Sequence, residues 1–276
     1  MSFARHGRGG RAVLACALAL ATAVPRLAAA EEPAPPTVEP LDPRSVYKVH
    51  PWIDGSIIVG SNAVTAGLYL FVTPTPTCPC DPMSVNSFDR HAIGYHSDGA
   101  DLAGTGLVAA SVLLPVGLDL AVIGPNRVAL EDSVVLAESL SVSGALVTIA
   151  KSGFQRPFPR TYAGFKVDDP NSYRSFYSGH TALAFTALST TAMTVGRRYH
   201  SYAVPWAITV IVGSAVGVSM IWSGWHFPSD VMVGAVMGTA TGVAVPALHF
   251  REPPLSPVVL RGPNGTPLVG LNLTWR

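Results

Sequence analysis

Six apolar stretches follow one another along the chain and are separated by polar connections. They cover residues 54–72, 102–124, 129–150, 179–196, 202–223 and 229–250. Each is about as long as an α-helix that crosses the ~30 Å hydrocarbon layer of a membrane. The pattern therefore predicts an all-α bundle of six helices that is embedded in a membrane.

Acidic residues and glycines interrupt these stretches. Charges at membrane depth are costly, so the acidic side chains are expected to face the bundle interior. A soluble exported bundle remains the alternative. Glycines spaced four apart, in "GAVMGTATG" and "GSAVG", predict faces where two helix backbones pack closely. The acidic residues are Asp119, Glu131, Asp132 and Glu138.

The connections differ in length and in charge. Residues 73–101 and 151–178 form long polar loops, whereas the turns at 125–128, 197–201 and 224–228 are short. Arginines in or after the short connections favour a topology with both long loops outside. A cleaved export signal followed by six spans predicts the opposite. Either residues 54–72 do not span, or the bundle is soluble.

The two ends of the chain differ from the apolar body, residues 51–250. Residues 1–30 have the order of an export signal: a basic start, a short apolar run and small residues near Ala30. Residues 31–50 are rich in proline and predict a linker. Residues 251–276 lack a helical period and predict two short strands around "GPNG", a hairpin-like tail.

Composition excludes one class of partner and limits the cysteine chemistry. Charged residues make up 13% of 276 residues and the net charge is +1, which argues against nucleic-acid binding. Cys78 and Cys80 are too few for a closed zinc site. They predict a local disulfide or free thiols without a catalytic role. Oligomeric state is left open.

Three polar clusters stand at the ends of apolar stretches. The first is "KSGFQRPFPRTY", which begins at Lys151, and the second is "YSGH", which ends at His180. The third, "SMIWSGWHFPSD", contains His226 and Asp230. Antiparallel helices would bring these three ends to one face of the bundle.

Together the clusters suit phosphoryl transfer. Lys151 and an arginine can clamp phosphate oxygens, and Gly179 lets the backbone come close to the anion. Free N–H groups at the start of the fourth helix add donors. Of two histidines, one can attack phosphorus while the other protonates the leaving oxygen. Asp230, four residues after His226, is placed to fix its tautomer.

In this order the clusters resemble the type 2 phosphatidic acid phosphatase / vanadium haloperoxidase superfamily, whose pattern is K-x6-R-P, P-S-G-H and S-R-x5-H-x3-D. The resemblance covers residues 50–250 and implies that family's six-helix bundle. It implies His226 as the nucleophile that forms a phosphohistidine, Asp230 as its orienting partner and His180 as the general acid. Lys151, Ser178 and Gly179 would hold phosphate oxygens, without a metal or cofactor.

The chain departs from the family pattern at two arginines. The expected arginines are replaced by Phe158 and Met220, and Tyr177 replaces the proline of the second motif. Losing one preorganised donor costs about 2.7–4 kcal/mol of transition-state stabilisation. Arg156 and Arg160 flank Phe158 and are expected to bind phosphate instead, Arg156 foremost. Arg174 is a candidate replacement at the second position.

The resulting expectation is a phosphatase of the cell envelope that hydrolyses a phosphomonoester or a lipid (pyro)phosphate. It would lie in the inner membrane with its site facing the periplasm, or be exported as a soluble periplasmic protein. The alternative is a catalytically impaired member that acts as a binding or scaffold protein, because of Phe158 and Met220. A haloperoxidase and a transporter fit the sequence less well.

Overall fold

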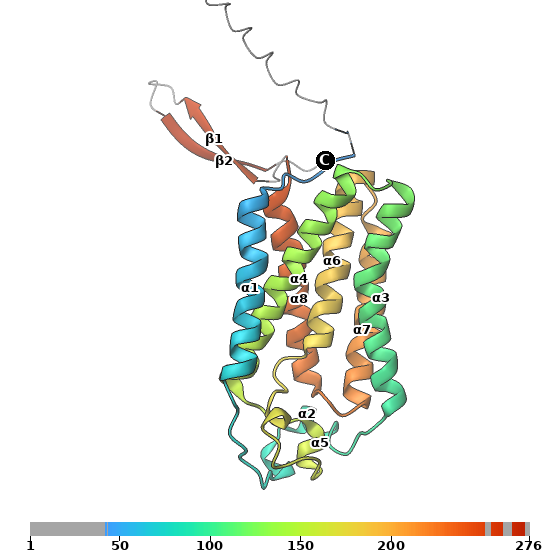
Figure 1. The fold of residues 1–276 in the computed structure, drawn as a ribbon, viewed down its shortest axis with the longest axis vertical. Helices are drawn as coiled ribbons and strands as arrows, with labels where there is room; N and C mark the ends of the chain where they lie inside the picture. Colours follow the sequence, from blue (N-terminus) through green and yellow to red (C-terminus); the bar gives the residue numbers. More distant parts are fainter. Residues whose placement is uncertain (1–41, 43, 252–254, 262–266, 274–276) are drawn as a thin grey trace, which may run out of the picture. The chain divides into compact units, whose positions relative to one another are not determined.

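The protein is described here from a computed structural model covering residue 42, residues 44–251 and the backbone of residues 255–261 and 267–273. Each of the six apolar stretches is helical, as the hydrophobic pattern predicts (Figure 1). The long helices in the described part of the chain are α1 (Pro51–Phe71), α3 (Asp98–Val122), α4 (Arg127–Phe154), α6 (Gly179–Tyr199), α7 (Ala203–Trp222) and α8 (Pro228–His249).

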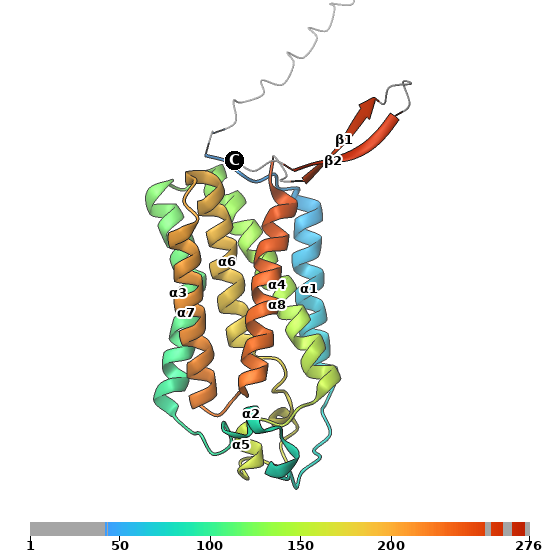
Figure 2. The same ribbon diagram turned by 180° about the vertical axis from the view of Figure 1, so that it is seen from behind.

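Helix α6 occupies the middle of the bundle. It packs against α8, α7, α4 and α3, while α1 packs against α4 on one flank (Figures 1 and 2). Many α6 side chains are small or hydroxylated and buried. Their hydroxyl groups bond to backbone or neighbouring side chains, as Thr186 Oγ1 does to Ser143 Oγ at 2.9 Å. This central place explains why α6 is the least apolar of the long helices.

Short elements gather at one end of the bundle. The loop after α1 contains η1 (Pro82–Ser84) and α2 (Ser87–Arg90), and the loop after α4 contains α5 (Pro159–Tyr162) and η2 (Pro170–Tyr173). Both loops lie at the end where α6 and α8 begin (Figures 1 and 2). We call this end the loop end. Cys78 and Cys80 form a disulfide within the first loop.

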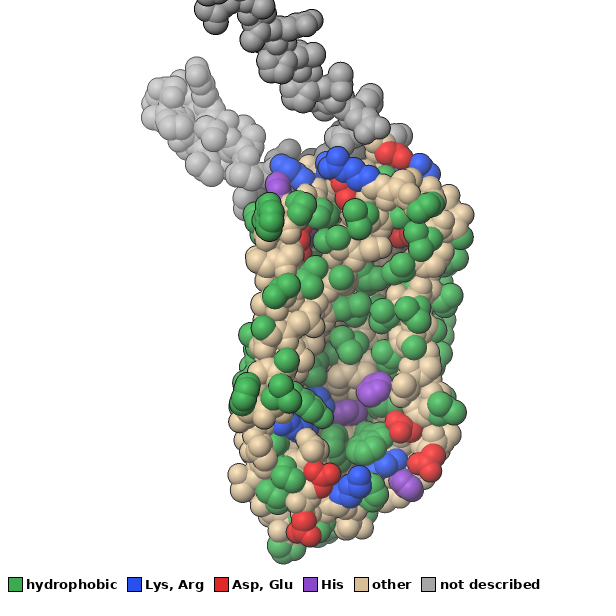
Figure 3. All heavy atoms as spheres, in the orientation of Figure 1, with side chains coloured by type: hydrophobic (Ala, Val, Ile, Leu, Met, Phe, Trp, Pro, Cys, Tyr) green, Lys and Arg blue, Asp and Glu red, His purple; other side chains and the backbone are tan. Residues whose placement is uncertain are grey.

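Four helices are long and apolar enough to cross a membrane, judged on the described residues: α3, α4, α7 and α8. Apolar side chains are spread along the face of the bundle seen in Figure 3. The exposed large apolar residues of the described part include Leu113 and Val210. The expectation that all six stretches could span is therefore met by four. Helix α6 is too polar, and α1 carries Asp54 and Asn62.

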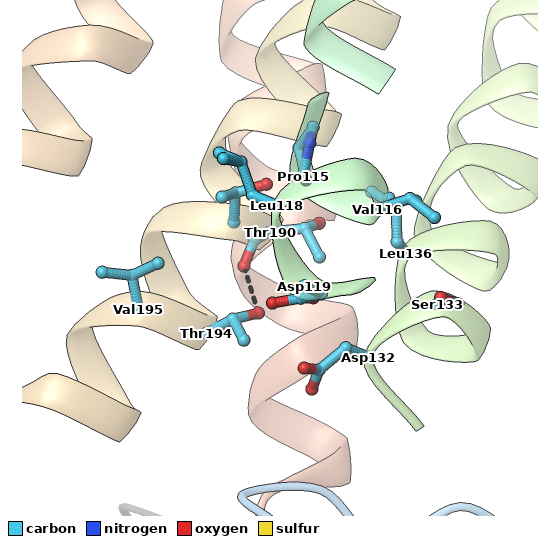
Figure 4. Close-up of a pocket in the computed structure, with 11 residues that line it drawn as sticks. Pro115, Val116, Leu118, Asp119, Asp132, Ser133, Leu136, Thr190, Thr194 and Val195 are labelled. Atoms are coloured by element: carbon cyan, nitrogen blue, oxygen red, sulfur yellow. Dashed lines mark hydrogen bonds between the residues drawn. The ribbon is translucent and has the colours of Figure 1, made fainter. Parts of the chain in front are cut away.

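The acidic residues of the apolar stretches face inward, as expected. Both carboxylate oxygens of Asp132 accept hydrogen bonds from Arg198, at 2.8 and 2.7 Å, and Asp119 lies 3.7 Å from the same guanidinium. Asp119 and Asp132 line a small cavity of about 80 Å³ together with Thr190 and Thr194 (Figure 4). Pairing of this kind reduces the cost of burying the two carboxylates.

The expected linker, residues 31–50, ends earlier than the sequence suggested. Tyr47 is fully buried. Its ring stacks on Phe250 with centroids 5.5 Å apart, and its hydroxyl lies 2.7 Å from Thr194 Oγ1. Residues 44–50 are therefore part of the bundle. The export signal and the rest of the linker lie outside the described residues.

The tail contains two antiparallel strands, β1 (Leu255–Arg261) and β2 (Pro267–Leu273). Their register pairs Val258 with Gly270 and Arg261 with Pro267. The two short strands expected on either side of "GPNG" are thus present and pair with each other. The "GPNG" stretch itself lies outside the described residues.

Helices α6 and α8 approach most closely along the expected glycine face. A Cβ added at Gly238 would collide with the backbone oxygen of Ala182, and one at Gly234 would lie 2.8 Å from the oxygen of Ser178. The packing interpretation of these glycines is confirmed. The contact matters for function because α6 and α8 both begin at the loop end.

We expect Gly238→Ala to lower the free energy of unfolding by about 1–3 kcal/mol, because backbone atoms of α6 would have to move. Denaturant unfolding in detergent measures this. Gly106→Ala on α3 is the matched control, since nothing lies within 4 Å of a Cβ there. Equal stability of the two variants would contradict the close approach.

Candidate active site

A cavity of about 410 Å³ at the loop end brings the three polar clusters together. Figure 3 shows histidine side chains in a hollow on this side of the bundle. Apolar and aromatic groups form the rest of its wall. The lining residues are Val108, Lys151, Phe158, Gly179, His180, Leu183, Trp225 and His226. The expected meeting of the clusters is thus observed.

Lys151 enters the cavity from the last turn of α4. Its ammonium group donates a hydrogen bond to the backbone oxygen of Arg174, at 2.5 Å, and lies 5.9 Å from the centre of the Phe158 ring. The ammonium keeps two further donors, because Lys carries three N–H groups. A fixed cation at the floor of a cavity suits an anionic ligand.

The start of α6 serves both as a helix cap and as part of the cavity. Ser178 is the N-cap: its hydroxyl accepts from the backbone N–H of Thr181 at 3.4 Å and is fully buried. Gly179 and His180 line the cavity. A Cβ at Gly179 would lie 3.9 Å from Cε of Lys151. Ser178 therefore acts on the helix, while the next two residues face the cavity.

His226 lines the same cavity as His180 and lies in the turn between α7 and α8. Its side chain is 5% exposed. Asp230 Oδ2 lies 3.7 Å from Nδ1, beyond hydrogen-bond distance, and Nδ1 has no partner among the described residues. Catalytic hydrogen bonds are commonly long in a protein without substrate and shorten when it binds. Nε2 is the ring nitrogen left for a ligand.

Asp230 is held from several sides. Its Oδ2 accepts from Ser175 Oγ at 2.5 Å and from the backbone N–H of Phe227 at 3.0 Å. Its Oδ1 accepts from Arg156 at 2.6 Å. The carboxylate is therefore fixed before any substrate binds. Ser175, which starts the stretch "SFYSGH", was not recognised as a site residue from the sequence.

Arg156 has a different place from the one expected. Its guanidinium donates to Asp230, to Ser229 Oγ at 2.9 Å and to Asp89 Oδ2 at 2.7 Å. It also lies 4.0 Å from the centre of the Phe227 ring and does not line the cavity. Its donors are directed at carboxylates rather than at the space where phosphate would sit. The structure thus places Arg156 against Asp230 and Asp89 and outside the cavity lining, and its expected role in phosphate binding stays a prediction.

Asp89 completes this network and was missed in the sequence. It is 1% exposed and lies on α2, in the loop after α1. Its carboxylate accepts from the backbone N–H of Ser229 at 2.9 Å and from the Ser229 hydroxyl at 2.7 Å. The signal "NSFD" indicates a capped helix start, with Asn86 as N-cap. It does not reveal that the helix reaches α8.

Burial and hydrogen bonding set the charge states of two groups at this end. Burial lowers the pKa of His226 to about 4, although Asp230 favours its charged form. Burial alone would raise the pKa of Asp89, but hydrogen bonds from Arg156 and Ser229 outweigh it and hold that pKa below its ordinary value. At neutral pH the imidazole is neutral and the carboxylate is ionised.

The two positions that lack the family arginine differ from each other. Phe158 forms part of the cavity wall, with its ring edge-on to His226 and centroids 5.8 Å apart. Met220 is fully buried between helices, among Ala184 and Val216. An apolar wall thus stands where one clamp was expected, and the other position points into the helical core.

Two further arginines lie near the cavity but not in its lining. Arg160 is 6% exposed, stacks 4.2 Å from the Trp225 ring centre and donates to the backbone oxygen of Ser223 at 2.6 Å. Its Nη2 has no hydrogen-bond partner among the described residues. Arg174 is turned toward α1 and donates to the oxygen of Val72 at 2.6 Å. Arg160 keeps a donor beside a wall residue of the cavity.

Known proteins are similar in sequence to the part of the chain that carries the three polar clusters. Residues 132–254 match the family model of the PAP2 superfamily. The lipid A 1-phosphatase of Porphyromonas gingivalis is 31% identical over 120 residues, which is 42% of this chain and 24% of that protein. The chain thus spans about a quarter of the length of that curated relative.

A solved structure is also similar. The crystal structure of Aquifex aeolicus LpxE aligns with a TM-score of 0.39 and 26% identity, over 56% of this chain and 90% of that one. The family match does not depend on this alignment. The matched segment, residues 132–254, contains Lys151, the "YSGH" stretch and the pair His226 and Asp230, so it is this part of the chain that is similar to the PAP2 superfamily.

Proposed function

We propose that this protein is a metal-independent phosphatase that removes phosphate from a lipid phosphate through a phosphohistidine at His226. The observation that carries the proposal is one cavity lined by Lys151, Gly179, His180 and His226. A dianionic phosphoryl group needs fixed positive charge and backbone donors around it. The same cavity supplies both, next to two imidazoles.

The proposed reaction proceeds in two steps. Nε2 of neutral His226 attacks phosphorus, the bond from phosphorus to the leaving oxygen breaks, and His180 gives its proton to that oxygen. In the second step His180 takes a proton from water, the water oxygen attacks phosphorus, and the bond from phosphorus to Nε2 breaks. Free phosphate leaves and His226 is restored. In both steps negative charge lies on the equatorial oxygens of the phosphoryl group, which Lys151 would bind.

The other residues have supporting roles in this proposal. Lys151 and the N–H groups at Gly179 and His180 bind equatorial oxygens, while Ser178 holds the start of α6 in place. Asp230 orients His226 and stabilises its positive charge once it is phosphorylated. Arg160 supplies its Nη2, which has no hydrogen-bond partner among the described residues and lies 4.0 Å from Asp98 Oδ1. These roles would compensate in part for Phe158 and Met220.

A lipid is favoured as substrate by the walls of the cavity and by the helices around it. Val108, Phe158, Leu183 and Trp225 are apolar lining residues, and four helices have the length and composition of membrane spans. The name of the Porphyromonas gingivalis relative also points to a lipid phosphate. We place the protein in the cell envelope, in the inner membrane with the cavity facing the periplasm.

Purified protein in detergent tests the substrate class. Release of phosphate should be faster from a lipid monophosphate, such as phosphatidic acid or lipid A, than from a soluble phosphomonoester of similar leaving-group pKa. Vanadate, which mimics the transferring group, should inhibit both. Equal rates on both substrate types would argue against a lipid substrate, and vanadate-insensitive hydrolysis would argue against the mechanism.

The depressed pKa of His226 predicts how activity depends on pH. Because neutral His226 is the nucleophile and protonated His180 is the acid, single-turnover phosphate transfer should rise as the pH falls toward the pKa of His180, which burial lowers, and should fall only below about pH 4. A histidine of ordinary pKa would lose activity near 6.5. Rates measured from pH 3.5 to 8, where the circular dichroism spectrum is unchanged, distinguish the two.

The same shift predicts a trend in stability. Between pH 6.5 and 4 the unfolded chain binds a proton at His226 that the folded chain does not bind. Stability therefore falls as the pH falls through this window, by on the order of 3 kcal/mol in total. Thermal unfolding of the wild type and of His226→Gln measures it, and the variant should show a flatter dependence.

The second candidate function is binding without turnover. The observation that favours it is Phe158, an apolar ring at the expected place of a phosphate clamp. In that case the protein would bind lipid phosphates and form no phosphohistidine. Trapping of the intermediate decides between the two functions.

A further inference from the structure

A second cluster of ionisable side chains lies in the other half of the bundle, away from the loop end. It consists of Asp54 on α1, Glu138 on α4 and His249 at the end of α8. One ligand atom from each lies within 4.8 Å of the others. Asp54 is 2% exposed and Glu138 4% exposed, so three helices direct metal-ligating groups at one buried point.

Among the described residues, no lysine or arginine forms an ion pair with the two carboxylates of this cluster. Among the ion pairs of the described residues, His249 is the basic partner of both carboxylates. Its Nε2 lies 3.4 Å from Glu138 Oε2 and 3.5 Å from Asp54 Oδ1. Glu138 Oε2 is buried and has no hydrogen-bond partner in the described part of the chain. Burying a carboxylate without a partner costs folding free energy, and a bound cation near this oxygen would reduce that cost.

The tautomer of His249 is fixed by its other nitrogen. Nδ1 lies 2.7 Å from the backbone oxygen of Val245, and a carbonyl oxygen can only accept a hydrogen bond. Nδ1 therefore carries the proton. In the neutral ring, Nε2 then presents its lone pair to two carboxylate oxygens, which repel it. A metal ion between these three atoms would remove the repulsion.

The surroundings have the hydrogen bonds found around metal ligands. Metal-binding histidines usually donate their second ring N–H to a backbone carbonyl or a carboxylate, as His249 does to Val245. Asp54 Oδ2 accepts from the backbone N–H of His50 at 2.7 Å, which leaves Oδ1 for the metal. Each of these contacts orients a ligand atom toward the shared point.

The two distances from His249 Nε2 to the carboxylate oxygens fit a tetrahedral ion. Bonds of 2.0–2.1 Å to zinc place neighbouring ligand atoms of a tetrahedron about 3.3–3.4 Å apart. The two distances from His249 Nε2, 3.4 and 3.5 Å, are close to that edge. One imidazole and two carboxylates form a ligand set that zinc accepts, with water as the fourth ligand.

We propose that Asp54 Oδ1, Glu138 Oε2 and His249 Nε2 bind a structural divalent ion, with Zn²⁺ as the preferred one. The ion links α1 to α4 and α8. It is separate from the cavity at the loop end and takes no part in the phosphatase reaction. It neutralises two buried carboxylates and fixes α1 on the bundle.

Zinc binding to the untagged full chain in detergent tests this proposal. After removal of metal with a chelator, Zn²⁺ is added and the metal that remains after desalting is counted per chain. The expected result is one tightly bound ion and a higher melting temperature, as for any ligand that binds only the folded state. Loss of a single outer partner costs 10–100-fold in metal affinity, so Glu138→Gln and His249→Asn should weaken binding by about 100-fold or more.

His200→Asn is the matched control. His200 caps α6 with a left-handed backbone, φ 54°, and asparagine tolerates that conformation. The control should bind zinc as the wild type does. If His200→Asn and His249→Asn bind equally, or if the wild type retains no zinc, the proposal is overturned. The latter result would indicate a protonated His249 bridging two carboxylates.

Cobalt gives a test that needs no variant. Co²⁺ in a tetrahedral site absorbs visible light far more strongly than in an octahedral one. The metal-free wild type should develop such a band at one equivalent of Co²⁺ and lose it when Zn²⁺ is added. Absence of the band would contradict the site even if the variants fail to fold.

Discussion

Replacing His226 by alanine is expected to abolish phosphate release, with a loss of about 10⁴-fold or more in kcat. The reason is that nucleophilic catalysis has no substitute in this cavity, and residues that act as a unit lose nearly all activity when one is removed. His180 faces the same cavity, but its proposed place is on the leaving-group side. Phosphate release from a lipid monophosphate in detergent is the measurement.

His91→Ala is the control for this experiment. His91 lies in the first long loop and is exposed, so its loss should leave kcat within about twofold of the wild type. Variant His226→Ala should also keep its affinity for inorganic phosphate, because Lys151 and the start of α6 remain. Activity that persists in His226→Ala would show that another group attacks phosphorus.

The second large effect is expected at Arg156, a residue that does not line the cavity. Its side chain holds Asp230 and Asp89, which are 0% and 1% exposed. Arg156→Met would leave both carboxylates buried without a cation, which costs about 3–5 kcal/mol of stability. Where the variant remains folded, kcat should fall roughly 10²-fold, since a displacement of about 1 Å at the nucleophile has that effect.

The pattern of kinetic changes separates positioning from phosphate binding. A positioning residue lowers kcat and leaves KM and the inhibition constant of phosphate nearly unchanged. A phosphate clamp would weaken inhibition by phosphate about as much as it lowers kcat. Arg156→Lys should restore part of the stability, because a lysine ammonium can form one of the two ion pairs that the guanidinium forms with Asp89 and Asp230. A large increase in the phosphate inhibition constant would contradict the positioning role.

Helices and the central pair of histidines could be predicted from the sequence for clear physical reasons. Apolar stretches of 18 residues or more have few structures open to them, and each became a helix. The motifs stand at helix ends, so up-and-down packing brings them together without detailed knowledge of the loops. Lys151, His180 and His226 therefore meet as expected.

The fold of the two long loops, and the contacts that their residues make with Asp230 and Arg156, could not be predicted in this way. Arg156 lies two residues from the expected clamp position, yet its direction depends on Asp89, which is 67 residues away in the chain. Ser175 and Asp230 are likewise joined across 55 residues. Such contacts depend on how two long loops fold at the end of the bundle, and neither hydrophobic period nor motif spacing specifies that fold.

Spacing alone also does not distinguish the two positions at which the expected arginines are replaced. Counting residues assigns Phe158 and Met220 to equivalent roles, but Phe158 lines the cavity while Met220 is buried between helices. A substitution at 158 changes the wall of the cavity. Restoring arginine at 220 would instead bury a charge among apolar side chains, so we expect an arginine at 158, and not one at 220, to strengthen phosphate binding.

Trapping the phosphoenzyme tests the central claim most directly. The protein is mixed with a lipid phosphate that carries ³²P, quenched in alkali, where phosphohistidine is stable, and digested for mass spectrometry. We expect one labelled site, at His226, which is absent from His226→Ala and lost on acid treatment. Phosphate release by the wild type without label on His226, or with label on another residue, would contradict the account.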